Sequence, residues 1–166
     1  DYRIATTTEY WSAATDFDGA AIADRAVTVQ IASSSSVTLE GAGTLNIVGA
    51  VGSATTTITN QGTGAYTIVA ADGTVNASAY SFLNLDPNGL QFTGDTTITS
   101  LSDGFFTQSV NNQSLITLAS TTLNANAGLV VTNTGFADDG FTGGVNVSLD
   151  ATTTNSWSFT GTVGNL

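Results

Sequence analysis

The stretch from Asp72 to Leu101 reads DGTVNASAYSFLNLDPNGLQFTGDTTITSL and decides the fold class. Gly, Asn, Asp and the single proline of the chain divide it into four short runs of β-favouring residues: Thr74–Asn76, Tyr80–Leu85, Leu90–Thr93 and Thr96–Leu101. Alternation of apolar and polar residues predicts strands, and nothing in the stretch has helical spacing. Each run is too short to bury a face alone. The pattern therefore predicts strands covered by similar strands from neighbouring parts of the chain.

Similar phrases recur on both sides of this stretch. Ile47 and Ile68 occupy related phrases 21 residues apart, Thr-Ile-Thr recurs after 40 residues, and a Gly-Leu-containing phrase recurs after 39 residues, at Gly89 and Gly128. These spacings share a unit near 20 residues, which predicts an all-β, single-domain parallel β-helix (β-solenoid) of about seven coils. The alternative fold is a β-sandwich filament subunit joined by strand donation from residues 1–15, although sandwich strands have no reason to recur evenly.

Residues 1–19 differ from the rest of the chain, because they mix aromatic residues with charges and end in Asp-Phe-Asp-Gly. The open end of a solenoid exposes apolar core and unpaired strand edges unless something covers it. The sequence therefore predicts an N-terminal cap or lead-in segment at residues 1–19 and a solenoid body at residues 20–166.

Alternate apolar residues of the body are expected to face inward and their polar neighbours to face water. Each buried side chain of this kind contributes about 1.5–3 kcal/mol. The predicted core consists of Val27, Val29, Ile31, Val37, Leu39, Leu45, Ile47, Ile58, Tyr66, Ile68, Phe82, Leu90, Phe92, Ile98, Leu129, Val131, Val145, Val147 and Leu149.

Composition excludes several classes of function. The chain has 13 acidic residues against two arginines, a net charge of −11, and no lysine, histidine, methionine or cysteine. Nucleic acid and anionic lipid surfaces are bound by Lys and Arg clusters, so neither is an expected partner. No run of about 20 apolar residues predicts membrane insertion. A charged fraction of 9% with abundant Thr, Ser, Gly and Asn is typical of secreted bacterial β-proteins.

Catalysis is not expected. Polysaccharide lyases and hydrolases on parallel β-helices need carboxylates together with a basic residue, and the two basic residues, Arg3 and Arg25, lie in or next to the predicted cap. Zinc and iron sites built from His or Cys are excluded by composition, and no phosphate-binding glycine loop is present.

Calcium is the one ion that this composition favours, since oxygen ligands in glycine-containing loops suit its coordination. The candidate ligands are Asp16 and Asp18, which precede Gly19, and Asp138 and Asp139, which precede Gly140. Asp86 and Asn88 precede a glycine in the same way. None of these loops matches a complete calcium-binding motif, so aspartates that simply form turns are the other interpretation. No further cofactor is expected.

Asparagines and phenylalanines give two more expectations. Some asparagines could stack as inward ladders between coils, or could be ordinary turn residues; they are Asn46, Asn60, Asn76, Asn84, Asn124, Asn133 and Asn146. Phe105, Phe106, Phe136 and Phe141 lie in Gly-, Asp- and Asn-rich stretches. They are predicted to sit in wider loops of the last coils, where they could bind a ligand.

Three segments carry a resemblance to a known class of protein: YWSAATDFDG at Tyr10–Gly19, GTLNIVG at Gly43–Gly49, and GTVNASAYSFLNLDPNGLQFTGDTTITSLSDGFF at Gly73–Phe106. Together they resemble large bacterial extracellular proteins built on right-handed parallel β-helices, in the manner of adhesins and autotransporter passengers. The resemblance implies a cell-surface or extracellular location and a structural or adhesive role.

The expected function is that of an extracellular structural protein that self-assembles into a cell-surface filament, sheath or matrix. Its main partner would be another copy of itself, stacked coil on coil at the ends, because edge pairing needs no special residues. The alternative is a binding module of a larger adhesin. In that case the partner would be a surface glycan, recognised by the aromatic and amide groups of the Phe105–Phe141 loops.

Overall fold

The computed structural model describes the backbone of residues 2–4, 8–11, 14–18, 26–52, 55–150 and 152–164, and the side chains of these residues from 26 onward except residue 150. Within these residues the protein is all-β with one short helix, α1 (Ser120–Ala125). Every described strand pair is parallel. Sandwich sheets are antiparallel, so the alternative fold of a β-sandwich is wrong.

The strands form three rows. Row 1 runs through β1 (Tyr2–Ile4), β4 (Val27–Ala32), β7 (Thr56–Gln61), the later parts of β9 (Thr74–Phe82) and β11 (Thr97–Thr107), and β14 (Gly135–Ala137). Row 2 runs through β2 (Thr8–Trp11), β5 (Ser36–Leu39), β8 (Tyr66–Ala70), β10 (Leu85–Phe92), β12 (Ser114–Ala119) and β15 (Val145–Asp150). Row 3 runs through β3 (Ala14–Asp18), β6 (Thr44–Val48), the first parts of β9 and β11, β13 (Val130–Thr132) and β16 (Ser158–Thr160).

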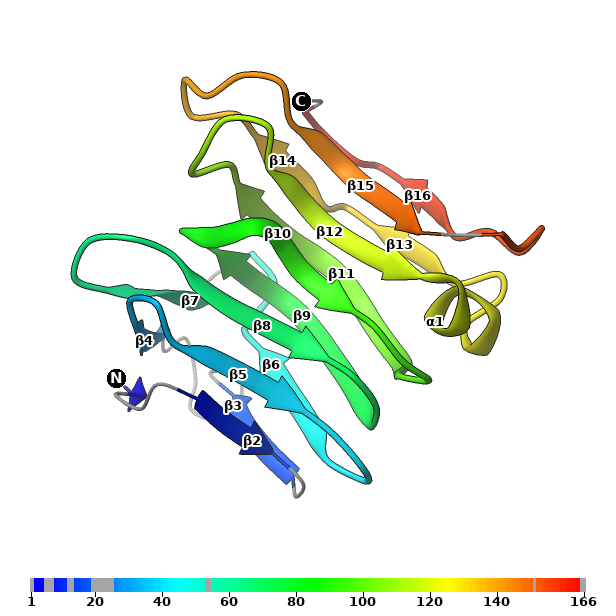
Figure 1. The fold of residues 1–166 in the computed structure, drawn as a ribbon, viewed down its shortest axis with the longest axis horizontal. Helices are drawn as coiled ribbons and strands as arrows, with labels where there is room; N and C mark the ends of the chain where they lie inside the picture. Colours follow the sequence, from blue (N-terminus) through cyan, green and yellow to red (C-terminus); the bar gives the residue numbers. More distant parts are fainter. Residues whose placement is uncertain are drawn as a thin grey trace.

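The chain passes through row 1, row 2 and row 3 in turn. It then returns to row 1, where the new strand lies beside the row 1 strand of the preceding passage. One such passage is called a rung here. The described strands form six rungs, from β1–β3 to β14–β16. Figure 1 shows row 2 on the near side, with β2 and β15 at its two ends.

The rung length differs from the predicted period of about 20 residues. Register partners in neighbouring rungs lie 22 to 31 residues apart at most positions, as Ile68 and Leu90 do at the short end and Val37 and Ile68 at the long end. The prediction of about seven short coils was wrong because all three rows share the same alternation. Ile47 lies in β6 of row 3, whereas Ile68 lies in β8 of row 2. The spacing between their similar phrases therefore measures the distance between two rows and not the length of a rung.

From β9 onward the corner from row 3 to row 1 is made by a single residue, whereas a longer connection joins β6 to β7. Ala79, Asp103, Asn133 and Gly161 occupy this corner in successive rungs, and each has a positive φ, between 50° and 63°. Glycine and asparagine adopt this left-handed conformation readily, and alanine does so at a cost. Because one residue suffices for the corner, β9 and β11 each continue from row 3 into row 1.

Inward side chains of the three rows form one core. Fourteen predicted core residues, from Val29 to Val131, are buried, together with residues that the prediction omitted, such as Tyr80, Phe106 and Leu118. Val27, Leu129 and Val147 are partly buried against this core. Val145 and Leu149 are exposed, contrary to prediction. Leu149 pairs with the buried Leu118 but lies on the last rung of row 2, and Val145 pairs with Ser114, which is itself only partly buried.

Asparagine ladders exist, but they face outward. Asn46 and Asn76 are register partners whose neighbours in the strand are buried, and the Asn76 Nδ2 donates to Asn46 Oδ1 at 3.2 Å. The Asn84 Nδ2 similarly donates to Asn60 Oδ1 at 2.8 Å. An inward amide would need partners within the apolar core, whereas outside it bonds to the next rung at no such cost.

The predicted cap at residues 1–19 contains β1, β2 and β3, which extend each row by one strand. These three strands are therefore a first rung. That this segment covers the end of the stack, and that a boundary lies at residue 19, remain predictions.

Candidate functional site

A stack of aromatic rings runs along the inside of row 1 toward the last rung. Phe82 and Phe106 stack with their ring centroids 5.3 Å apart, and Phe106 and Phe136 stack at 5.8 Å. Phe136 then meets Phe159 of row 3 edge to face at 6.3 Å. Pairs of this kind contribute about 0.5–1.5 kcal/mol beyond their buried area. The stack therefore holds row 1 and row 3 in fixed positions at the last rung.

At the last rung, inward side chains of row 2 are not covered by a further described strand. Leu118 in β12 is 1% exposed, whereas its register partner Leu149 in β15 is 57% exposed. The two leucines occupy the same inward position in neighbouring rungs. The difference between them is the strand that covers Leu118, which is β15 itself.

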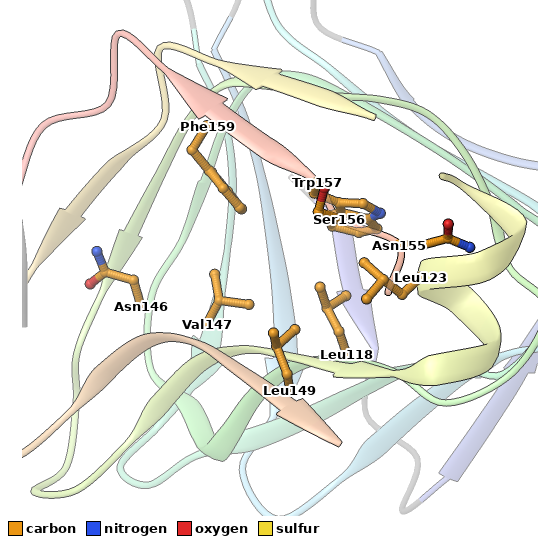
Figure 2. A pocket seen from close by; sticks show the side chains of 9 residues that line it. All are labelled: Leu118, Leu123, Asn146, Val147, Leu149, Asn155, Ser156, Trp157 and Phe159. Carbon is orange, nitrogen blue, oxygen red and sulfur yellow. The ribbon is translucent and has the colours of Figure 1, made fainter. Parts of the chain in front are cut away.

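The uncovered positions surround an apolar cavity of about 370 Å³. Figure 2 shows Leu118, Val147 and Leu149 on one wall, facing Trp157 and Phe159 on the other. Leu123 of α1 closes one side, and Asn146, Asn155 and Ser156 supply the polar groups of the rim. A mainly apolar cavity of this size with a few polar groups is the usual form of a binding site.

Trp157 is the unusual residue of this cavity. Its ring lies edge to face with Phe92, at 6.1 Å between centroids, and its Nε1 is buried without a hydrogen-bond acceptor. Burying such a donor unpaired costs about 1–3 kcal/mol. A molecule that enters the cavity with a suitably placed acceptor would remove this cost.

Strand edges adjoin the cavity. Among the described strands, β15 pairs with β12 alone and β16 with β13 alone, so each has one edge without a partner strand. Row 1 continues further at this end, because Val163 forms a parallel bridge with Gly135. The free backbone groups at this end thus belong to rows 2 and 3, beside the cavity.

The two predicted calcium sites, Asp16 with Asp18 and Asp138 with Asp139, lie in the first and the last rung and remain predictions. Asp138 Oδ1 accepts a 3.2 Å hydrogen bond from the Gly140 amide, and Asp139 has a φ of 47°, as turn-forming aspartates do. Asp16 and Asp18 lie in β3, at the opposite end of the rows, and their side chains are outside the described part. Among the described residues no three His, Cys, Asp or Glu side chains are close enough to share a metal ion.

Asp86 has protein partners at both carboxylate oxygens. Its Oδ2 accepts from the Thr67 hydroxyl at 2.6 Å and from Gln91 Nε2 at 3.3 Å, and its Oδ1 accepts from the Asn88 amide at 2.8 Å. These bonds fix the turn that leads into the rest of β10. They give Asp86 a structural role on row 2.

The four phenylalanines predicted in wide loops have different positions. Phe105 and Phe106 lie in β11 and Phe136 lies in β14, so the prediction of loops was wrong for these three. Phe106 and Phe136 are buried in the aromatic stack and cannot contact a surface ligand. Phe105 points outward and is 41% exposed, and Phe141 is half-buried in the loop after β14.

Among the residues whose side chains are described, Tyr66 and Tyr80 have shifted pKa values. Burial raises the pKa of Tyr66 well above its ordinary value, and its hydroxyl donates to the Ile58 carbonyl at 3.0 Å. Burial also raises the pKa of Tyr80; a side-chain hydrogen bond with Thr134 opposes this and the charge of Asp103 adds to it. Both phenols therefore stay protonated inside the core.

The sequence predicts only some of the residues that line the cavity. The alternation Ser156-Trp157-Ser158-Phe159-Thr160 predicts a last strand with aromatic residues, and Ser158–Thr160 is indeed β16. The part played by Leu118 was missed because its run looks like any other core strand, and that of Leu123 was missed because it is a single leucine among polar residues of α1.

Comparison of the chain with protein-family models, with curated proteins and with solved structures gives no match. Within its described residues, no helix has the length and apolar content needed to cross a membrane. Any functional conclusion must therefore come from the geometry of the chain itself.

Proposed function

We propose that this chain is a β-solenoid subunit of an extracellular structural assembly, in which copies stack end to end into a filament, sheath or matrix. Three parallel rows wound through six rungs support the solenoid description. Stacking further rungs on such a body extends the same hydrogen bonds and the same core.

The observation that carries the proposal is the uncovered last rung. Leu149 is exposed at an inward register position, beside strand edges that lack a partner strand in the described part. Exposed edges of this kind are places where another chain can pair. A partner strand over β15 would bury apolar surface and supply main-chain hydrogen bonds at once.

Composition and the resemblance to bacterial surface proteins support the extracellular part of the proposal. The charged fraction is 9% and the chain has no cysteine or lysine. Polar character rests on hydroxyl and amide groups, such as those of the outward Asn46 and Asn76.

Electron microscopy at rising protein concentration, with light scattering, tests the proposal. We expect particles that lengthen with concentration for the wild-type chain and isolated particles for Leu149→Lys, because the new charge would lie in the contact. Leu149 is already mostly exposed, so this variant should still fold. Val51→Lys is the matched control, since Val51 is also exposed and lies in the turn after β6. Isolated wild-type particles at every concentration would contradict the proposal.

A second candidate function is a glycan-binding module of a larger adhesin. The observation that favours it is the outward ring of Phe105, which lies against Gly135 on row 1. Flat exposed aromatic rings offer an apolar surface to sugar rings. Binding of the wild-type chain to a glycan array, lost in Phe105→Ala, would support this function.

A further inference from the structure

We infer that the cavity end of one copy receives the first rung (β1, β2 and β3) of a second copy, so that the assembly is polar. This inference rests on the proposed function and adds to it the identity and orientation of the partner surface. Three properties of the two ends favour this pairing over contact between two identical ends.

The first property is the direction of the strands. Among the described strands, β15 and β16 pair with β12 and β13 alone at one end, and β2 and β3 pair with β5 and β6 alone at the other. Contact of the first rung with the last would continue parallel pairing, which all described pairs use. Contact between two last rungs would require antiparallel pairs and would place the two cavities face to face.

The second property is the apolar pattern of the first rung. Tyr2, Ile4, Trp11 and Phe17 are the register partners of Val29, Ile31, Leu39 and Ile47, which are all buried. The first rung therefore has apolar residues at core register positions in all three rows, together with Glu9 and Thr15, which pair with the buried Val37 and Leu45. The cavity walls at the other end are apolar as well. Joining these two ends would make one continuous core.

The third property is charge. After Arg25 the chain has no basic residue, and Asp138, Asp139 and Asp150 all belong to the last rung or its loop. Two last rungs in contact would bring these carboxylates together without a cation, which costs free energy. The first rung contains Arg3, in row 1, and Asp138 directly follows β14 of the same row. Head-to-tail contact brings opposite charges together in row 1 alone, because Glu9 of row 2 and Asp16 and Asp18 of row 3 are also in the first rung.

Trp157 supplies an anchor for the incoming rung. Its Nε1 is buried and lacks an acceptor in the isolated chain, where the ring lies against Phe92. A strand placed over β16 would bring carbonyl groups to this side of the cavity. The indole N–H would donate to the second copy once the ring turns toward it.

Orientation can be tested by blocking one end at a time with a small monomeric protein joined to the chain. A fusion before Asp1 blocks the first rung, and a fusion after Leu166 blocks the last rung, while every residue of the chain stays unchanged. Sedimentation measures the mass of each fusion alone and of an equimolar mixture. We expect both fusions to stay monomeric alone and to form a 1:1 heterodimer when mixed.

Other outcomes would overturn the inference. Dimers of the N-terminal fusion alone would mean that two last rungs pair, and dimers of the C-terminal fusion alone would mean that two first rungs pair. Either kind of dimer would overturn this inference and leave end-to-end stacking standing. Monomers in all three samples, with a wild-type chain that still assembles, would place the contact away from the ends and would overturn end-to-end stacking as well. A wild-type chain that never assembles would end the proposed function and this inference together.

Trp157→Phe tests the anchor in the same heterodimer. The variant keeps an aromatic ring beside Phe92 and removes the N–H. We expect the dissociation constant to rise between about 2-fold and 10-fold, the range for one hydrogen bond, with no loss of thermal stability in the fusion alone. An unchanged dissociation constant would overturn the role of the indole N–H.

Discussion

Leu118 and Leu149 occupy the same inward position on neighbouring rungs, yet one is buried and the other is mostly exposed. The surrounding sequences are alike, SLITLA in β12 and VNVSLD in β15. What differs is the neighbour, because β12 lies between two strands and β15 has one described partner. In this fold the burial of a residue is decided by the next rung, which makes the middle and the last rung energetically different regions.

The largest effect is expected in the middle of the stack. Phe106→Ala should lower the free energy of unfolding by about 3–5 kcal/mol, because it opens a void between the rings of Phe82 and Phe136. Phe105→Ala is the matched control on the outward side of the same strand, with an expected loss of about 1 kcal/mol. Urea denaturation measures both. Equal losses would show that the stack is not the rigid part of the core.

The comparison of the two leucines can be made directly. Leu118→Ala should cost about 2–3 kcal/mol, toward the lower end for a buried leucine because Leu118 borders the cavity. Leu149→Ala should cost about 0.5 kcal/mol in dilute solution, where its side chain is already in water. If the cost at Leu149 matches that at Leu118 in dilute monomer, the last rung is covered in some other way.

Alkaline pH should weaken the middle rungs. Because the pKa values of Tyr66 and Tyr80 are raised in the folded chain, these tyrosines lose their protons at a lower pH in the unfolded chain, where the pKa of tyrosine is about 10. Their stabilising contribution is complete below that pH and is lost as the pH rises, by up to about 1.4 kcal/mol per pH unit for each tyrosine. Unfolding measured at several pH values above 9 should therefore show a shallower decline in Tyr66→Phe and Tyr80→Phe. An identical decline in both variants and wild type would contradict the burial of the phenols.

The smallest effect concerns the corner residue, which is Ala79 in the middle and Gly161 at the last rung. Ala79→Gly removes a left-handed strain of about 1–2 kcal/mol but also loses a buried methyl group and frees the unfolded chain, so stability should change by less than about 0.5 kcal/mol. Ala77→Gly, in the straight part of β9, also loses a buried methyl group and frees the unfolded chain, but it removes no left-handed strain. It should therefore lower stability by about 1.5 kcal/mol. Equal costs measured by thermal unfolding would argue against strain at the corner.

The sequence predicted strands and most of the core, because alternation of apolar and polar residues is a local property. Val29, Ile58 and Phe82 could be assigned inward in this way, and they form one column of row 1. Rung length could not be predicted by eye. Every rung contains three similar strands, and features such as α1 lengthen some rungs and not others, so a recurring phrase need not lie in the same row.

The candidate site was hidden for a related reason. Alternation gives Leu149 the same inward assignment as Leu118, and nothing nearby in the sequence says whether a further strand covers it. The alternation around Trp157 indicates that it belongs to a last strand with aromatic residues on one face. Its unpaired N–H, however, depends on what lies across the cavity, which is a property of the folded stack.

Amide hydrogen exchange at low and high protein concentration tests end-to-end pairing most directly. The amides of β15 and β16 that do not pair with β12 and β13 should exchange quickly in dilute solution and slow down as concentration rises, because a second copy then holds them. Exchange in β12 should not change, since its neighbours are already in place. Exchange in β15 and β16 that stays the same while the particles grow would contradict pairing at this end.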